Sequence, residues 1–200
     1  VMAPDITRYL PLLPAVFGRP GDARADLPYH TADAPMASTH PLFNAFARLL
    51  EVAGSRITAP AIADLLALPE ISRRLGLDDE DRDALLRTLA ESRAAWALDA
   101  RHRAGFGVPG HPANSLGWAM ARMLAGYLVS DAPSPDSETL LELADGETLL
   151  PLGGLHGPQA AALGALDGLL GILQELQSWQ QQTYKASEWA RRLGILASQA

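Results

Sequence analysis

The chain of 200 residues contains no cysteine. This absence excludes a disulfide framework and any zinc site built on thiolates, and it is consistent with a cytoplasmic location. Hydrophobic residues make up 48% of the chain and charged residues 20%. A chain of this length and composition is globular rather than disordered, and it can bury a core as one large domain or two small ones.

Lysine is almost absent, because only Lys185 among the sixteen basic residues is a lysine. A phosphate-binding loop needs the pattern G-x-x-x-x-G-K-[ST], in which backbone amides and the lysine reach the phosphates. No glycine pattern precedes Lys185, and the GRPG stretch at 18–21 indicates only a turn. We therefore expect no nucleotide and no other cofactor to bind this chain itself.

Metal-binding and nucleophilic patterns are also missing. No two histidines stand three or four residues apart, so no helical pair of ligands is available. The acidic run at 78–81 could hold magnesium in a nuclease, but its place at a predicted helix start favours a structural role. There is no G-x-S-x-G motif. The sequence thus predicts no metal ligand and no catalytic residue. The histidines are His30, His40, His102, His111 and His156.

The chain lacks the basic surplus that free-standing DNA-binding proteins carry, since its net charge is −7. By itself it is not expected to bind nucleic acid strongly. The longest apolar run, 160–173, is interrupted by Asp167 and several glycines, and it is too short to span a bilayer. Residues 1–5 show no basic region and no apolar signal core. We expect no membrane partner.

Hydrophobic periodicity and capping residues predict a mainly α-helical chain with a small β contribution at the N-terminal end. Strands are expected at 1–5 and 27–30, and a linker at 132–136. Leu42, Phe46, Leu49 and Leu50 should face inward from the second helix. Thr58, Asp78, Ser115 and Ser187 are the expected helix caps. The predicted helices cover 11–17, 41–50, 58–66, 69–75, 79–92, 115–128, 158–182 and a last stretch from 187.

Arginine pairs are the strongest candidates for contact with DNA or a partner protein. Arg73 and Arg74 end one predicted helix, and Arg101 and Arg103 follow Trp96. Each guanidinium can grip a phosphate or a carboxylate, although solvated helix ends also favour cations. Five aromatic side chains can either stack on bases or pack in the core, and their helical spacing favours the core. They are Trp96, Trp118, Tyr127, Trp179 and Trp189.

A series of motifs, spread in order over about four-fifths of the chain, resembles the RecC family, the gamma subunits of exodeoxyribonuclease V. Two departures stand out: Ala97 occupies the position where the family usually has a glycine, and Leu116-Gly117 replaces a Trp-Arg pair. The motifs are VMAPDI at 1–6, AVFG at 15–18, LPY at 27–29, HPLFNAF at 40–46, SRIT at 55–58, DLL at 64–66, GLDDED at 76–81, Trp96, NS at 114–115, RMLAGY at 122–127, Trp179 and Trp189.

The resemblance implies a helicase-like subunit of superfamily 1 that has lost its ATP-hydrolysis motifs. Residues 1–40 would end a degenerate α/β motor core, and residues 41–200 would form the inserted helical subdomain. RecC-type chains scaffold RecB-type and RecD-type subunits and guide DNA in repair and recombination. Their complex is an ATP-dependent helicase and exodeoxyribonuclease, which uses ATP and magnesium through the other subunits.

Three functions remain open at this point. The first is a non-catalytic structural segment of such a complex, with Arg73, Arg74, Arg101 and Arg103 in contact with DNA or a partner. The second is an active helicase or nuclease segment, which the missing phosphate loop disfavours. The third is an independent helical adaptor that binds a protein and never meets DNA, which the net negative charge allows.

Overall fold

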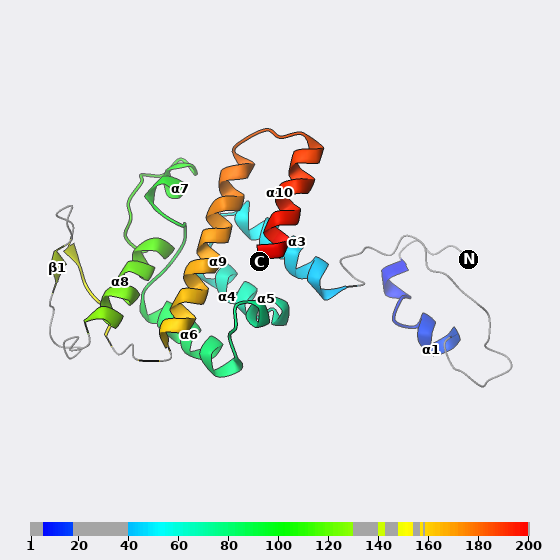
Figure 1. Cartoon of the computed structure of the whole chain (residues 1–200), viewed down its shortest axis with the longest axis horizontal. Helices are drawn as coiled ribbons and strands as arrows, with labels where there is room; N and C mark the ends of the chain where they lie inside the picture. The colour runs from blue at the N-terminus through cyan, green and yellow to red at the C-terminus, as the bar shows by residue number, and fades with distance from the viewer. Residues whose placement is uncertain are drawn as a thin grey trace. The chain divides into compact units, whose positions relative to one another are not determined.

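The computed structural model describes residues 6–17, 40–129, 140–142, 148–153, 157 and 159–199. The chain divides into two compact units, Val1–Asn44 and Ala45–Ala200 (Figure 1). The strands predicted at 1–5 and 27–30 and the linker predicted at 132–136 lie outside the described residues. The described part is mainly helical, as the periodicity predicted.

The first unit contains a short 3-10 helix η1 (Ile6–Arg8) and helix α1 (Leu13–Phe17). The predicted helix over 11–17 therefore begins two residues later than expected, and Pro11 lies in the turn that leads into it. That turn is held by backbone bonds, among them the one from the Leu13 amide to the Tyr9 carbonyl at 3.1 Å.

Capping residues set the starts of three helices in the second unit where the sequence predicted them. Thr58 Oγ1 accepts a hydrogen bond from the Ala61 amide at the start of α4 (Ala59–Leu66). The Asp78 side chain accepts a hydrogen bond from the Asp81 amide at the start of α6 (Asp79–Glu91). The Ser115 side chain accepts one from the Trp118 amide at the start of α8 (Leu116–Leu128). Because a cap satisfies amides within one turn, its position follows from local sequence alone.

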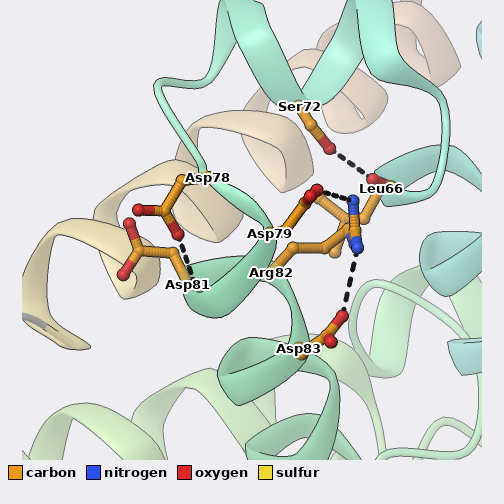
Figure 2. A network of polar contacts seen from close by, with 7 residues as sticks. All are labelled: Leu66, Ser72, Asp78, Asp79, Asp81, Arg82 and Asp83. Carbon is orange, nitrogen blue, oxygen red and sulfur yellow. Dashed lines mark hydrogen bonds and ion pairs between the residues drawn. The ribbon is translucent and has the colours of Figure 1, made fainter.

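Helix α5 (Pro69–Arg74) follows α4 in the chain, and its C-cap Leu75 is followed by Gly76. Gly76 has φ +70°, the left-handed conformation that costs other residues a steric penalty. Ser72 is buried and donates its hydroxyl to the Leu66 carbonyl, so α5 is tied back to the end of α4 (Figure 2). The tie orients the exposed last turn of α5, which carries the arginine pair.

The long helix α9 (Gln159–Gln180) is the centre of the second unit. Its buried side chains recur every three or four residues and meet α6 on one side and α8 on another (Figure 1). Burial of each leucine contributes about 2 kcal/mol, so this stripe supplies much of the stability. α3 (Pro41–Ala53) adds Leu49 and Val52 to the same core. The buried residues of α9 are Ala162, Leu163, Leu166, Leu169, Leu170, Leu173, Leu176 and Trp179.

A small antiparallel sheet joins β1 (Leu141–Glu142) and β2 (Thr148–Leu149), with Leu141 opposite Leu149. The sequence did not predict these strands, and two residues each are too few for a clear alternating pattern. The chain that follows β2 returns to α8, where the Leu152 amide donates to the Arg122 carbonyl at 2.9 Å. The hairpin formed by β1 and β2 is therefore attached to the helices of the second unit through α8.

Three local predictions were wrong. Leu42 exposes 59% of its surface, because the buried stripe of α3 begins one turn later at Ala45. Ser187 lies inside the last helix, α10 (Ala186–Gln199), rather than capping it. The stretch after Trp96, where no helix was predicted, contains the short helix α7 (Ala100–Ala104), which Asp99 caps. Five residues are too few for a helical period to show in the sequence.

Ala97 gives the departure from the family pattern a physical meaning. Its φ is +72°, in the left-handed region where glycine is the least strained residue. The position is fully buried, and its amide donates to the Ile57 carbonyl at 3.0 Å while its carbonyl accepts from the Leu116 amide at 2.8 Å. This segment thus connects the starts of α4 and α8, and the backbone bonds hold the conformation that the side chain disfavours.

Candidate functional site

A pocket of about 390 Å³ opens between the end of α3, helix α7 and the C-terminal half of α9. Most of its lining residues carry polar side chains, and one of them is Arg101, a predicted contact residue. α7 lies beside the end of α9 (Figure 1). The lining residues are Ala53, Gly54, Ser55, Asp99, Arg101, His102, Gly105, Phe106, Gln174, Gln177, Ser178, Gln180 and Gln181.

Local hydrogen bonds hold α7 in place at the pocket wall. Asp99 Oδ1 accepts from the His102 amide at 2.7 Å and begins the helix. The buried His102 ring returns to the chain before it, since its Nδ1 accepts from the Leu98 amide at 3.0 Å. This acceptor role places the proton of the neutral ring on Nε2. Arg101, next to His102, is thereby presented outward into solvent.

Arg103 is committed to the fold. Its Nη1 donates to the carbonyl oxygens of His111 at 2.7 Å and Ala113 at 2.9 Å, and its Nη2 donates to that of Trp96 at 3.2 Å. The guanidinium also lies 4.9 Å from the centre of the Trp96 ring. These contacts fasten the loop between α7 and α8, so the same donors are not free for a phosphate in this arrangement.

Arg101 differs from Arg103 in being exposed, and it forms no ion pair with the described part of the chain. Arg56 is a second exposed cation nearby, which sequence reasoning had not singled out. It lies 5.5 Å from the Trp96 ring centre and 5.8 Å from that of Phe106. Its only sequence signal was its place in the SRIT motif. Arg56 and Arg101 are therefore the available cations beside the pocket.

Phe106 contributes an accessible aromatic ring to this region. It exposes 39% of its surface, although it packs edge-on against His102 at 5.3 Å and against Trp96 at 6.1 Å between ring centres. Sequence reasoning missed it because it follows a helix too short to be recognised. The predicted aromatics behave differently: Trp179 is buried, and Trp96, Trp118, Tyr127 and Trp189 are partly buried against the core or the loops.

Burial lowers the pKa of His102 from its ordinary value of 6.5, while the neighbouring carboxylate of Asp99 opposes the shift. The unfolded chain therefore takes up a proton near pH 6.5 that the folded chain resists. Folding stability consequently falls as the pH drops through 6.5, and the loss continues until the folded-state pKa is passed.

We expect the free energy of unfolding to decrease between pH 7 and pH 5, by at most about 1.4 kcal/mol per pH unit for one group. His102→Gln, which removes the ionisable ring, should make this pH dependence shallower in urea titrations at each pH. Glu188 does not interfere, because Arg191 and Arg192 hold its pKa at about 2 and its contribution is lost only below about pH 4.5. An equal slope for parent and variant would contradict the assignment to His102.

The second predicted pair, Arg73 and Arg74, occupies the exposed last turn of α5. The structure does not bring this pair into the pocket that Arg101 lines. Cations here favour the negative end of the helix dipole, so a structural contribution exists beside any contact role. The predicted contact residues thus form two separate groups rather than one site.

The acidic run at the start of α6 is accounted for by local contacts (Figure 2). Asp78 Oδ1 accepts from the Asp81 amide at 2.8 Å. Arg82 bridges the neighbouring carboxylates, at 2.8 Å from Asp79 and 3.2 Å from Asp83. Within the described residues, no group of three or more His, Asp or Glu side chains is arranged to hold a metal ion. These contacts support a structural role for the acidic run at the start of the helix.

Arg122 is the most buried charged residue among those described, with 7% of its surface exposed. Its Nε donates to the Leu150 carbonyl at 2.8 Å, and its Nη1 donates to the Ser92 carbonyl at 2.8 Å. The guanidinium lies 4.8 Å from the Trp118 ring centre. Burial lowers the pKa of Arg122, and nearby Arg93 lowers it further. Arg122 therefore joins α6, α8 and the hairpin strand instead of meeting solvent.

Within the described part of the chain, none of the helices combines the length and apolar character that a membrane-spanning segment requires.

Comparison with known proteins identifies relatives over most of the chain. The family model described as the fourth domain of the RecBCD enzyme subunit RecC matches residues 39–200. The RecBCD enzyme subunit RecC of Mycobacterium tuberculosis H37Rv is 30% identical over 186 residues, which is 90% of this chain and 17% of that protein. The protein of the same name in Mycolicibacterium smegmatis is 33% identical over 159 residues, 72% of this chain and 15% of its own length. The Escherichia coli K12 protein of that name is 28% identical over 194 residues, 94% of this chain and 16% of its own length.

Proposed function

The chain belongs to the RecC family, and on that premise we propose that it is a non-catalytic structural segment of a RecBCD-type helicase–nuclease complex. In this role it supports subunit assembly and the shape of the DNA channel during double-strand break repair and recombination. The partners are RecB-type and RecD-type subunits, which bring the ATP and magnesium chemistry, and DNA. The chain spans 17%, 15% and 16% of the three relatives above, so these partners belong to the proposal.

The observation that carries the proposal is the family match over residues 39–200. The match begins close to the division proposed from the resemblance, with residues 1–40 ending a degenerate motor core and 41–200 forming a helical subdomain. In the described residues, the acidic run, the capping residues and Arg103 and Arg122 all support the fold. Side chains that are used to hold the fold together are what a scaffolding role requires.

Arg73 and Arg74 supply the test, since they are exposed on a turn that Ser72 anchors. The double change Arg73→Ala and Arg74→Ala should reduce assembly with the RecB-type and RecD-type subunits, or binding of duplex ends, about tenfold. This factor corresponds to about 1.4 kcal/mol for the pair, and arginine is enriched among the residues that dominate interfaces. The measurement is recovery of the variant in the full chain with a tagged RecB-type subunit, followed by end binding.

Arg87→Ala is the matched control, because Arg87 is an exposed arginine on the neighbouring helix α6. Assembly and unwinding equal to the control would remove the arginine pair from the interface. Recovery of the native chain with unrelated proteins, and without any helicase–nuclease subunit, would instead favour the independent helical adaptor.

A further inference from the structure

The pocket between α3, α7 and α9 presents unused amide groups along one helix face. Gln174, Gln177 and Gln181 follow one another at intervals of three and four residues, so their side chains share a face of α9 and its continuation. None of the three side-chain amides makes a hydrogen bond with the described residues. Each amide offers both a donor and an acceptor, so a polar ligand that enters the pocket can bond to these groups in place of water.

The rim of the pocket adds cations and an aromatic ring to these amides. Arg101 lines the pocket and points to solvent, and Arg56 lies 5.8 Å from the ring centre of Phe106, which also lines the pocket. A cation next to an exposed ring suits a ligand that has a planar unsaturated group and a negative charge close together. The glutamine amides would contact the edge of the ligand's planar group, and the guanidinium groups of Arg56 and Arg101 would contact its negative charge.

We infer that this pocket binds one unpaired nucleotide of a single strand, with the base edge among the glutamines and the phosphate at Arg101. Glutamine amides form paired hydrogen bonds with base edges, most favourably with adenine, and a base can stack on an exposed aromatic ring such as Phe106. An acidic peptide fits less well, because its carboxylates would meet neutral amides and the carboxylate of Asp99. The inference rests on the proposed contribution to the DNA channel and assigns that contribution to a defined site.

The test is photo-crosslinking in the assembled complex, which keeps the chain in its native surroundings. The probe is a single-stranded adenine oligonucleotide with one 5-iodouracil base, which forms a covalent adduct with an aromatic side chain in contact with it. We expect an adduct on the peptide that contains Phe106. Excess unlabelled adenine oligonucleotide should abolish it, whereas an abasic oligomer of equal length should compete at least tenfold less well, because it offers phosphates without a base.

Arg101→Ala and Gln177→Ala should each reduce the Phe106 adduct about tenfold, and Arg87→Ala should leave it unchanged. Equal adduct yields in all variants, equal competition by the abasic oligomer, or adducts confined to other peptides would each overturn the nucleotide pocket. Subunit assembly is measured in the same preparations. Assembly without the adduct rejects this pocket alone, whereas failure of the parent chain to assemble rejects the proposed function itself.

Discussion

Replacing Arg122 with alanine is expected to lower the free energy of unfolding by about 4 kcal/mol. The buried Ser92 carbonyl and the part-buried Leu150 carbonyl would each lose a charged donor. Each such loss costs about 1.5–3 kcal/mol when the acceptor stays buried. The change also removes the side chain that stacks on Trp118 and leaves space beside it.

The expected loss of stability is large because of where the Ser92 carbonyl lies. Ser92 follows the last residue of α6, where carbonyl groups have no partner within the helix. Arg122 reaches it from α8, thirty positions along the chain, and satisfies it from the side. The same guanidinium holds Leu150 just after β2, so its loss frees the hairpin segment from the helices as well.

Urea unfolding followed by circular dichroism measures the change. Arg87→Ala again serves as the control, and it should change the free energy of unfolding by no more than about 0.5 kcal/mol. Arg122→Lys should give an intermediate loss, because an ammonium group keeps the charge but cannot reach both carbonyls in the planar arrangement of a guanidinium. If Arg122→Ala shifts the unfolding midpoint no more than Arg87→Ala does, the proposed connection between α6, α8 and the hairpin contributes nothing.

Replacing Gly126 with alanine is expected to destabilise the protein by about 3 kcal/mol, although alanine normally favours a helix. A Cβ atom at this position would lie 1.7 Å from the Leu152 carbonyl oxygen and 2.5 Å from its carbon. These are backbone atoms and cannot rotate away, so the segment after β2 must move from α8. That movement would break the bond from the Leu152 amide to the Arg122 carbonyl.

Gly168→Ala provides the matched control, because a Cβ atom there meets nothing within 4 Å and the residue also lies inside a helix. This control should gain up to about 1 kcal/mol from helix propensity. The two substitutions therefore have opposite expected signs in the same thermal or urea unfolding assay. A gain for Gly126→Ala would mean that the segment after β2 does not pack on α8 as described.

The starts of three helices and the end of a fourth were predictable because their causes are local. Thr58, Asp78 and Ser115 each cap a helix within the next three residues, and Gly76 ends one through its own backbone conformation. The leucines of α9 likewise recur at the spacing of a buried helix face, which is a property of their order in the chain. The mainly helical class and the family were therefore accessible from the order of residues.

The chemistry of the candidate site was less predictable, because it depends on which surfaces meet. Arg101 and Arg103 are equivalent in the sequence, yet backbone carbonyls from two loops occupy only Arg103. Leu42 fits the apolar face of α3 but lies a turn before the core begins. The glutamine face of α9 was visible, whereas its meeting with Arg101 and Phe106 was not.

The sequence by itself determined most of the helices, three of their caps, the absence of cysteine and the family resemblance, since each of these depends on neighbouring residues or on their order. Only the tertiary structure decided which arginines are tied to carbonyl groups, where Gly126 allows two backbones to touch, and which side chains share the pocket. The physical reason is distance along the chain: Arg122 and Ser92 are thirty positions apart, and their contact exists only because α6 and α8 both pack against α9.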